Sequence, residues 1–126
     1  MKQLSTDTRW PSGCAWTIGL LDRSPEQIQQ LGVHFDRAED DLDTLQTAVL
    51  YDRSVGLLRL LSRDHAPIRG VEVQVDASIS RDRGLSALVR QLGLDRDALS
   101  WITEDPEYIG FRPQVAPAAA PVSAAL

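Results

Sequence analysis

Residues 71–77, with the sequence VEVQVDA, alternate apolar and polar side chains more strictly than any other stretch of this chain. Successive side chains of a strand point to opposite faces, so Val71, Val73 and Val75 would face a core. Glu72 and Gln74 would then lie on the other face, as in an antiparallel sheet with one polar side. Such a sheet needs neighbouring strands beside it and helices over its apolar face.

Other strands are predicted where short apolar runs are bounded by turn residues. Residues 44–51 and 57–63 are predicted to form a hairpin, because residues 52–56 between them have turn composition. In its first strand, four alternate residues would share one face: Leu45, Thr47, Val49 and Tyr51. Further strands are predicted at residues 14–21 and 100–104, with residues 107–111 as an additional candidate.

Two helices are predicted from their end signals. Ser24, Pro25 and Gln27 stand where a capping box requires them, which predicts a helix over residues 25–31 that ends at Gly32. The second helix would begin after Ser80 and end before Gly93. Its core-facing stripe is predicted from the spacing i, i+3, i+4 and i+7: Leu85, Leu88, Val89 and Leu92. Asp95 would cap one further turn.

These elements predict a single small α+β domain, with a mostly antiparallel sheet of four to five strands and two helices packed on one face. We expect a flexible N-terminal arm over residues 1–13, the domain itself over residues 14–112, and a disordered tail rich in Ala and Pro over residues 113–126. Trp16 and Trp101 lie in strand-like runs and are predicted to be in the core, while Trp10 is predicted to be exposed.

Composition narrows the classes of function. The 126 residues carry a formal net charge of −5, which does not match the basic footprint of a nucleic-acid-binding protein. The first residues lack the apolar segment of a secretory signal, no apolar run is long enough to span a membrane, and Cys14 is the only cysteine. We therefore expect a soluble cytoplasmic protein that binds neither nucleic acid nor membrane.

The acidic stretch at residues 34–51 does not match a known metal-binding pattern. Registers of a Ca²⁺ loop that begin at Asp36 or Asp41 lack ligands, the central glycine and the final glutamate. Two histidines and one cysteine are too few for a zinc site without other ligands. No glycine pattern that binds phosphate is present either. We expect neither a metal nor a cofactor, and the acidic stretch is either a solvated connection or a surface for a cationic partner.

Three hypotheses of function remain, and one of them is an accessory domain whose tail rich in Ala and Pro tethers a larger assembly. We expect a non-catalytic protein-binding module, of the kind seen in small acidic bacterial immunity, antitoxin or inhibitor proteins. Its partner would be another protein with a basic surface, and the oligomeric state is left open. The predicted contact residues are Glu39, Asp40, Asp41, Asp43, Asp95, Asp97, Asp105 and Trp10.

The alternative hypothesis is a small-ligand-binding or catalytic domain. Asp64 and His65 are adjacent at the end of a predicted strand, where an Asp–His pair could serve as an oriented base. Cys14 or His34 would be the further reactive group, although Cys14 lies among apolar neighbours that favour a structural thiol.

Overall fold

A computed structural model describes residues 1–39, 43–65 and 69–103 of the chain. It confirms the predicted fold class, because one antiparallel sheet carries two helices. The strands are β1 (Lys2–Leu4), β2 (Ala15–Leu21), β3 (Asp36–Glu39), β4 (Thr44–Asp52), β5 (Gly56–Arg63), β6 (Val71–Asp76) and β7 (Leu99–Ile102). The helices are α1 (Pro25–Gln29), α2 (Arg81–Leu92) and the 3₁₀ turn η1 (Arg96–Ala98).

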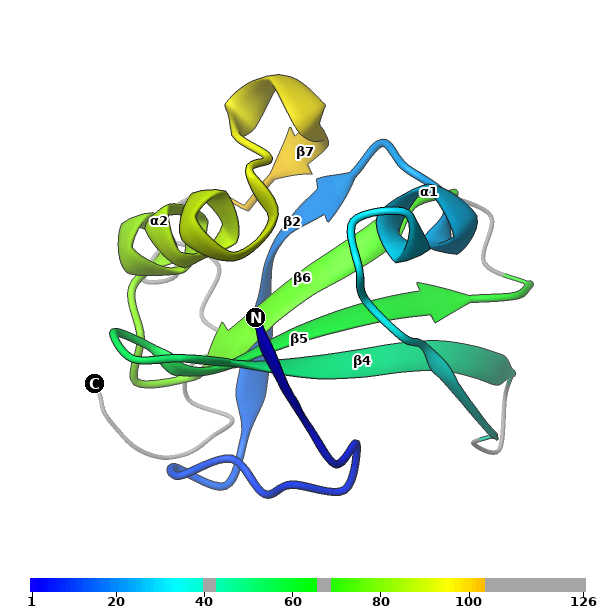
Figure 1. Ribbon diagram of the computed structural model, residues 1–126. Helices are drawn as coiled ribbons and strands as arrows, with labels where there is room; N and C mark the ends of the chain where they lie inside the picture. Colours follow the sequence, from blue (N-terminus) through cyan, green and yellow to red (C-terminus); the bar gives the residue numbers. More distant parts are fainter. Residues whose placement is uncertain (40–42, 66–68, 104–126) are drawn as a thin grey trace.

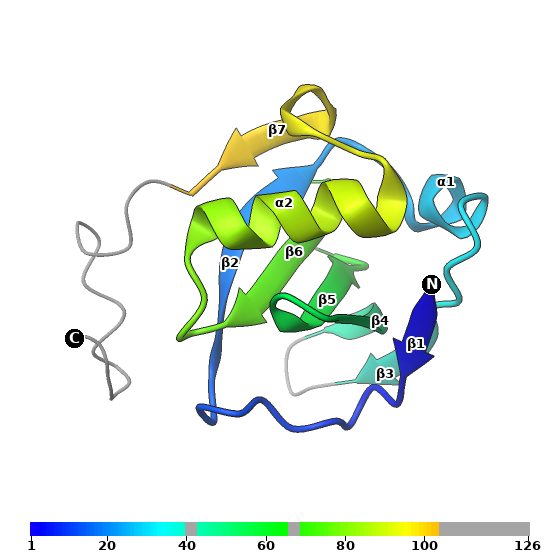
Figure 2. The same ribbon diagram turned by 60° about the vertical axis from the view of Figure 1, so that its left-hand side comes forward.

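The sheet order is β1-β4-β5-β6-β2-β7, and β3 also pairs with β4 (Figure 1). The predicted hairpin is present as β4 and β5, and its register places Leu50 opposite Leu58 and Tyr51 opposite Leu57. Helix α2 lies across β6 and β2, and η1 follows it directly before β7 (Figure 2). The sheet has seven strands rather than four to five, because β1 and β3 were not predicted.

The starts of both helices and the end of α2 follow the predicted signals. The Ser24 hydroxyl accepts a hydrogen bond from the Gln27 backbone N–H at 3.2 Å, and the Gln27 side chain accepts one from the Ser24 N–H at 2.8 Å. Helix α1 is shorter than expected, since it ends at Gln29. Ser80 caps α2, and Gly93 ends it with a left-handed φ of 71°. These local interactions fix where both helices start and where α2 ends.

The core lies between the helices and one face of the sheet. Val71, Val73 and Val75 are fully buried there, as their alternation predicts. Helices α1 and α2 belong to the same core, so they cover the same face of the sheet. The other large members are Trp16, Ile18, Leu21, Ile28, Phe35, Leu50, Leu58, Leu60, Leu85, Leu88 and Leu92.

Two predicted core residues are exposed. Trp101 is 50% exposed, because it lies opposite Leu20 on the sheet face away from the helices, while the neighbouring Ile102 packs against the core. Val89 is 47% exposed. Helix α2 presses its Gly84 side against the sheet, which turns Val89 away from the core.

The second face of the sheet is crossed by the segment that joins β1 to β2. Arg59 lies between the core residues Leu58 and Leu60 of β5, so its side chain is on this second face. Its Cζ atom lies 5.2 Å from the centroid of the Trp10 ring, a cation–π contact. Ser12 donates two hydrogen bonds to Asp76, from its backbone N–H at 2.9 Å and its hydroxyl at 3.0 Å. Trp10 is therefore half-buried rather than exposed as predicted. Part of the predicted arm, residues 2–4, forms β1.

Several predictions lie outside the described residues. These are the candidate strand at residues 107–111, the tail at residues 113–126, and the carboxylates of Asp40, Asp41 and Asp105. Among the helices of the described ranges, none is long and apolar enough to cross a membrane.

Candidate functional site

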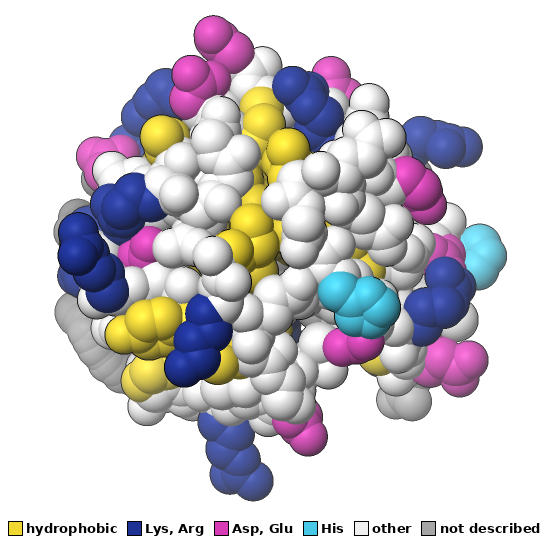
Figure 3. Space-filling model, in the orientation of Figure 1, with side chains coloured by type: hydrophobic (Ala, Val, Ile, Leu, Met, Phe, Trp, Pro, Cys, Tyr) yellow, Lys and Arg dark blue, Asp and Glu magenta, His cyan; other side chains and the backbone are white. Residues whose placement is uncertain are grey.

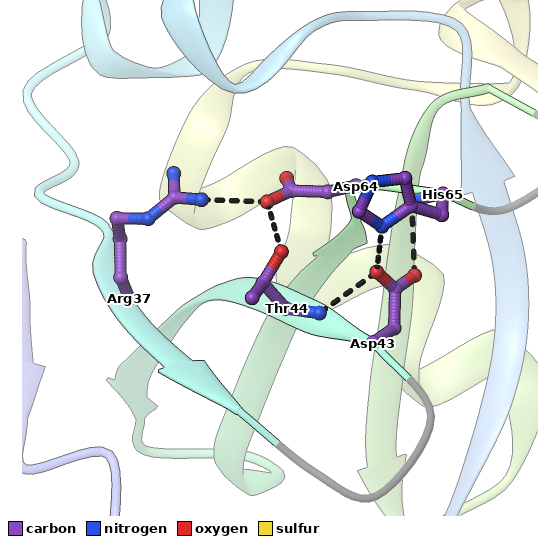
Figure 4. A network of polar contacts seen from close by, with 5 residues as sticks. All are labelled: Arg37, Asp43, Thr44, Asp64 and His65. Atoms are coloured by element: carbon purple, nitrogen blue, oxygen red, sulfur yellow. Dashed lines mark hydrogen bonds and ion pairs between the residues drawn. The ribbon is translucent and has the colours of Figure 1, made fainter.

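The adjacent residues Asp64 and His65 do not pair with each other. His65 instead contacts Asp43, which precedes β4: the imidazole Nδ1 lies 2.6 Å from Asp43 Oδ1, and the His65 backbone N–H donates to Oδ2 at 3.0 Å (Figure 4). The backbone N–H of Thr44 also donates to Asp43 Oδ1 at 2.7 Å. The His65 backbone N–H bond is the main cause that lowers the pKa of Asp43.

Asp64 belongs to the same network, because Thr44 contacts both Asp43 and Asp64. Its carboxylate accepts a hydrogen bond from the Thr44 hydroxyl and a charged one from Arg37 of β3 at 2.6 Å (Figure 4). The Thr44 bond, followed by the positive charge of Arg37, lowers the pKa of Asp64. Asp64 therefore joins β3, β4 and the end of β5, and it does not orient the imidazole of His65.

The two other candidates for the catalytic hypothesis lie elsewhere. The backbone C=O of Cys14 accepts a hydrogen bond from the Ala77 N–H, just beyond the C-terminal end of β6. That end of β6 is remote from His65. His34 is hydrogen-bonded through its backbone to the Gln3 side chain, and its ring lies 3.2 Å from Asp36. An Asp–His pair is thus present as Asp43 and His65, but the described contacts supply it with no nucleophile.

A hollow of about 410 Å³ lies beside Asp64, between the start of α1 and the ends of β5 and β6. Its charged lining is balanced, with three carboxylates and three guanidinium groups: Asp22, Glu26, Asp64, Arg23, Arg63 and Arg69. Ser24, Ser62, Gln27 and Gln46 add neutral polar groups. His65 does not line this hollow.

The first predicted acidic surface is divided by the fold. Glu39 is exposed on β3, and Asp36 is exposed but paired with His34. Asp43 is held by His65 and Thr44. Among the described carboxylates of this stretch, Glu39 is the one that remains unpaired. Contacts within the protein therefore engage Asp36 and Asp43, which reduces the charge that is free to contact a partner.

The second predicted acidic surface borders a groove between α2 and η1, which we call the α2–η1 groove. It encloses about 400 Å³. Its apolar lining consists of Leu85, Leu88 and Val89, and its carboxylates are Asp82, Asp95 and Asp97. Ser86 and Arg96 complete the lining. Acidic side chains project at the top of the view in Figure 3, where Figure 1 places η1.

The three carboxylates of the α2–η1 groove differ in their contacts. Asp95 accepts a hydrogen bond from the Asp97 backbone N–H at 3.0 Å and so caps η1. Asp82 lies 3.3 Å from Arg81 and 3.7 Å from Arg96, and the second pair joins the two walls of the groove. Within the part of the chain that the structure describes, the Asp97 carboxylate has no hydrogen bond or ion pair.

Sequence analysis predicts Asp95 and Asp97 as contact residues but does not predict the wall of the groove that α2 forms. Asp82, Ser86 and Val89 follow the spacing i, i+4 and i+7, which places them on one stripe of α2 beside its buried stripe. That spacing was the available signal. Val89 also fits the core-facing spacing of Leu85, Leu88 and Leu92, so the sequence alone does not separate the two stripes.

Among the described residues, no group of three or more His, Cys, Asp or Glu side chains could hold a metal ion. Comparisons with protein-family models, curated proteins and solved structures find no match for this chain. Its function is therefore argued from its residues.

Proposed function

We propose that this protein is a non-catalytic binding module whose partner is another protein with a basic surface. The observation that supports this most is the α2–η1 groove, where the exposed side chain of Val89 lies beside carboxylates from both walls. Protein interfaces combine an apolar centre, which supplies affinity, with charged residues around it that select the partner. The net charge of −5 favours the same class of partner.

Of the two predicted acidic surfaces, we favour the second. The carboxylates near β3 are largely engaged by His34, His65 and Thr44. Asp97 is exposed and unpaired among the described residues, and apolar side chains lie next to it. A small acidic inhibitor or immunity protein would need such a combination of exposed charge and apolar area.

Affinity capture from the native cell tests this proposal when it is run with matched variants. The Val89→Ser/Asp97→Asn variant alters the groove, whereas Glu39→Gln removes one unpaired exposed carboxylate elsewhere. We expect one basic protein to be recovered with the wild type and with Glu39→Gln, and to be lost with the groove variant. Recovery that is equal for all three would refute the groove as the binding surface.

A small-ligand function is the second candidate, and the hollow beside Asp64 supports it. A lining with equal numbers of carboxylates and guanidinium groups suits a ligand that carries both charges, such as a free amino acid. A thermal-shift panel of amino acids would test it, with Arg69→Gln as the variant that should abolish any stabilisation. Without a ligand-dependent rise in melting temperature, this candidate fails.

A further inference from the structure

We propose that the α2–η1 groove receives an amphipathic helix of the partner, with Lys or Arg on its flanks; this inference rests on the proposed function. The residues that line the groove belong to α2 and to residues 95–97, and none of them belongs to a strand. One wall is the helix α2, whose end is closed by the hydrogen bond from the Gly93 N–H to the Val89 C=O. The other is η1, closed by the bond from the Ala98 N–H to the Asp95 C=O. A partner that docks here must satisfy its own backbone, and a helix does so.

The apolar and charged groups of α2 have a helical spacing that a second helix can match. Asp82 and Val89 are seven residues apart, which corresponds to about 10 Å along the helix axis. Two turns of a partner helix cover that length. Its apolar side chains at i and i+3 or i+4 would contact Leu85 and Val89, while cations on its flanks would contact Asp82 on one side and Asp97 on the other.

Arg96 opposes a basic helix in two ways. Its guanidinium carries the same sign as the partner, and its contact with Asp82 at 3.7 Å extends across the groove. Both side chains are well exposed, so the contact is weak and easily replaced. An incoming Lys or Arg would therefore take Asp82 from Arg96. Removal of the Arg96 charge should strengthen binding, which a purely structural role of Arg96 does not predict.

The test uses a fluorescein-labelled peptide of Leu, Ala and Lys, about 14 residues long, which is near the length at which isolated helices form. A second peptide has the same composition with a central Pro, and a third has Glu in place of Lys. Binding to the full chain is followed by fluorescence anisotropy at low and high salt. The protein variants are Val89→Ser, Asp97→Asn and Arg96→Gln, with Glu39→Gln and Arg53→Gln as controls of matched charge.

We expect the helical Lys peptide to bind, and the Pro and Glu peptides to bind at least about tenfold more weakly. Asp97→Asn should weaken binding several-fold at low salt only, and Val89→Ser should weaken it at both salt concentrations. Arg96→Gln should strengthen it about threefold relative to Arg53→Gln. Equal binding of the Pro peptide would overturn the helical partner while leaving the proposed function intact. If Glu39→Gln and Asp97→Asn have equal effects, the groove is not the site, and the proposed function fails with it.

Discussion

Asp52 is a carboxylate whose burial is made possible by its contacts. It is 1% exposed at the end of β4 and accepts five hydrogen bonds. Arg90 donates two of them, at 3.1 and 2.9 Å, and Gln91 donates a third, so the last turn of α2 is fixed to the β4–β5 turn. The backbone N–H groups of Ser54 and Val55 donate the others. A buried charge with this many donors joins α2 to the sheet.

Asp52→Asn should lower the free energy of unfolding by about 2–3 kcal/mol, because the amide loses the charge that faces Arg90 and presents N–H groups to other donors. Urea unfolding of the variant and the wild type measures the difference. Asp22→Asn is the control, since Asp22 is exposed, and it should change the free energy by less than about 0.5 kcal/mol. A cost for Asp52→Asn no greater than that of the control would contradict the role given to Asp52.

Two buried carboxylates, Asp52 and Asp76, make the free energy of unfolding depend on pH. Hydrogen bonds from Arg90, above all, hold the pKa of Asp52 well below its ordinary value. Burial alone would raise the pKa of Asp76, but hydrogen bonds from Ser78 and Ser12 outweigh it and lower that pKa. A lowered carboxyl pKa stabilises the fold above the pKa of the unfolded chain, about 3.9, and this stabilisation is lost as pH falls further.

The free energy of unfolding should therefore fall between pH 5 and pH 3 in the wild type and fall less in Asp52→Asn. Denaturant unfolding at about five pH values across that range measures both slopes. Parallel slopes for the two proteins would show that Asp52 does not titrate with folding.

At the scale of elements, the position of α2 depends on Gly84. A Cβ atom there would lie 2.5 Å from Ile18 Cδ1 and 3.1 Å from Val75 Cγ1, and both of those side chains are fully buried. Close approach at this one point turns the helix about its axis. The rotation buries Leu85 and Leu88 and leaves Val89 beside the groove.

Gly84→Ala should destabilise the protein by about 1–3 kcal/mol, although Ala is the better helix former. The end of the Ile18 side chain would have to move, and this movement costs energy because Ile18 is fully buried in a closely packed core. Ser86→Ala, at an exposed position of the same helix, is the control and should be neutral or slightly stabilising. Thermal unfolding of both variants decides the sign, and a stabilising Gly84→Ala would show that α2 does not rest on this contact.

The sequence predicts those elements whose side chains carry a burial pattern. The alternation at residues 71–75 and the caps at Ser24 and Ser80 are local signals, and the structure bears them out. The strand β3 has four exposed residues, so its pairing with β4 leaves no apolar pattern to detect. β1 is only three residues long, and its pairing with β4 is non-local.

The candidate sites were harder to predict, because they depend on register. The contact of His65 with Asp43 joins residues 22 positions apart, and the register of β4 on β5 decides that Asp43, not Asp64, reaches the imidazole. Trp101 fits a core pattern as well as Trp16 does. β7 lies at the edge of the sheet, and there the pleat directs Trp101 away from the helices.

At the scale of the whole molecule, no single field of one sign dominates the face in Figure 3, where basic and acidic side chains alternate around the margin. The net charge of −5 alone would attract any cation over a broad area. The central claim is narrower: a basic partner is held where carboxylates lie beside the exposed apolar side chain of Val89, in the α2–η1 groove. Charge without apolar area, as at β3, should contribute little to affinity.

Backbone amide chemical shifts of nitrogen-15-labelled protein, recorded while the helical Lys peptide is added, test that claim most directly. We predict that the largest shifts fall on α2 from Asp82 to Leu92 and on residues 93–98, with small shifts for β3 and for Trp10. Shifts that are largest at residues 36–39, or spread evenly over exposed carboxylates, would contradict the account.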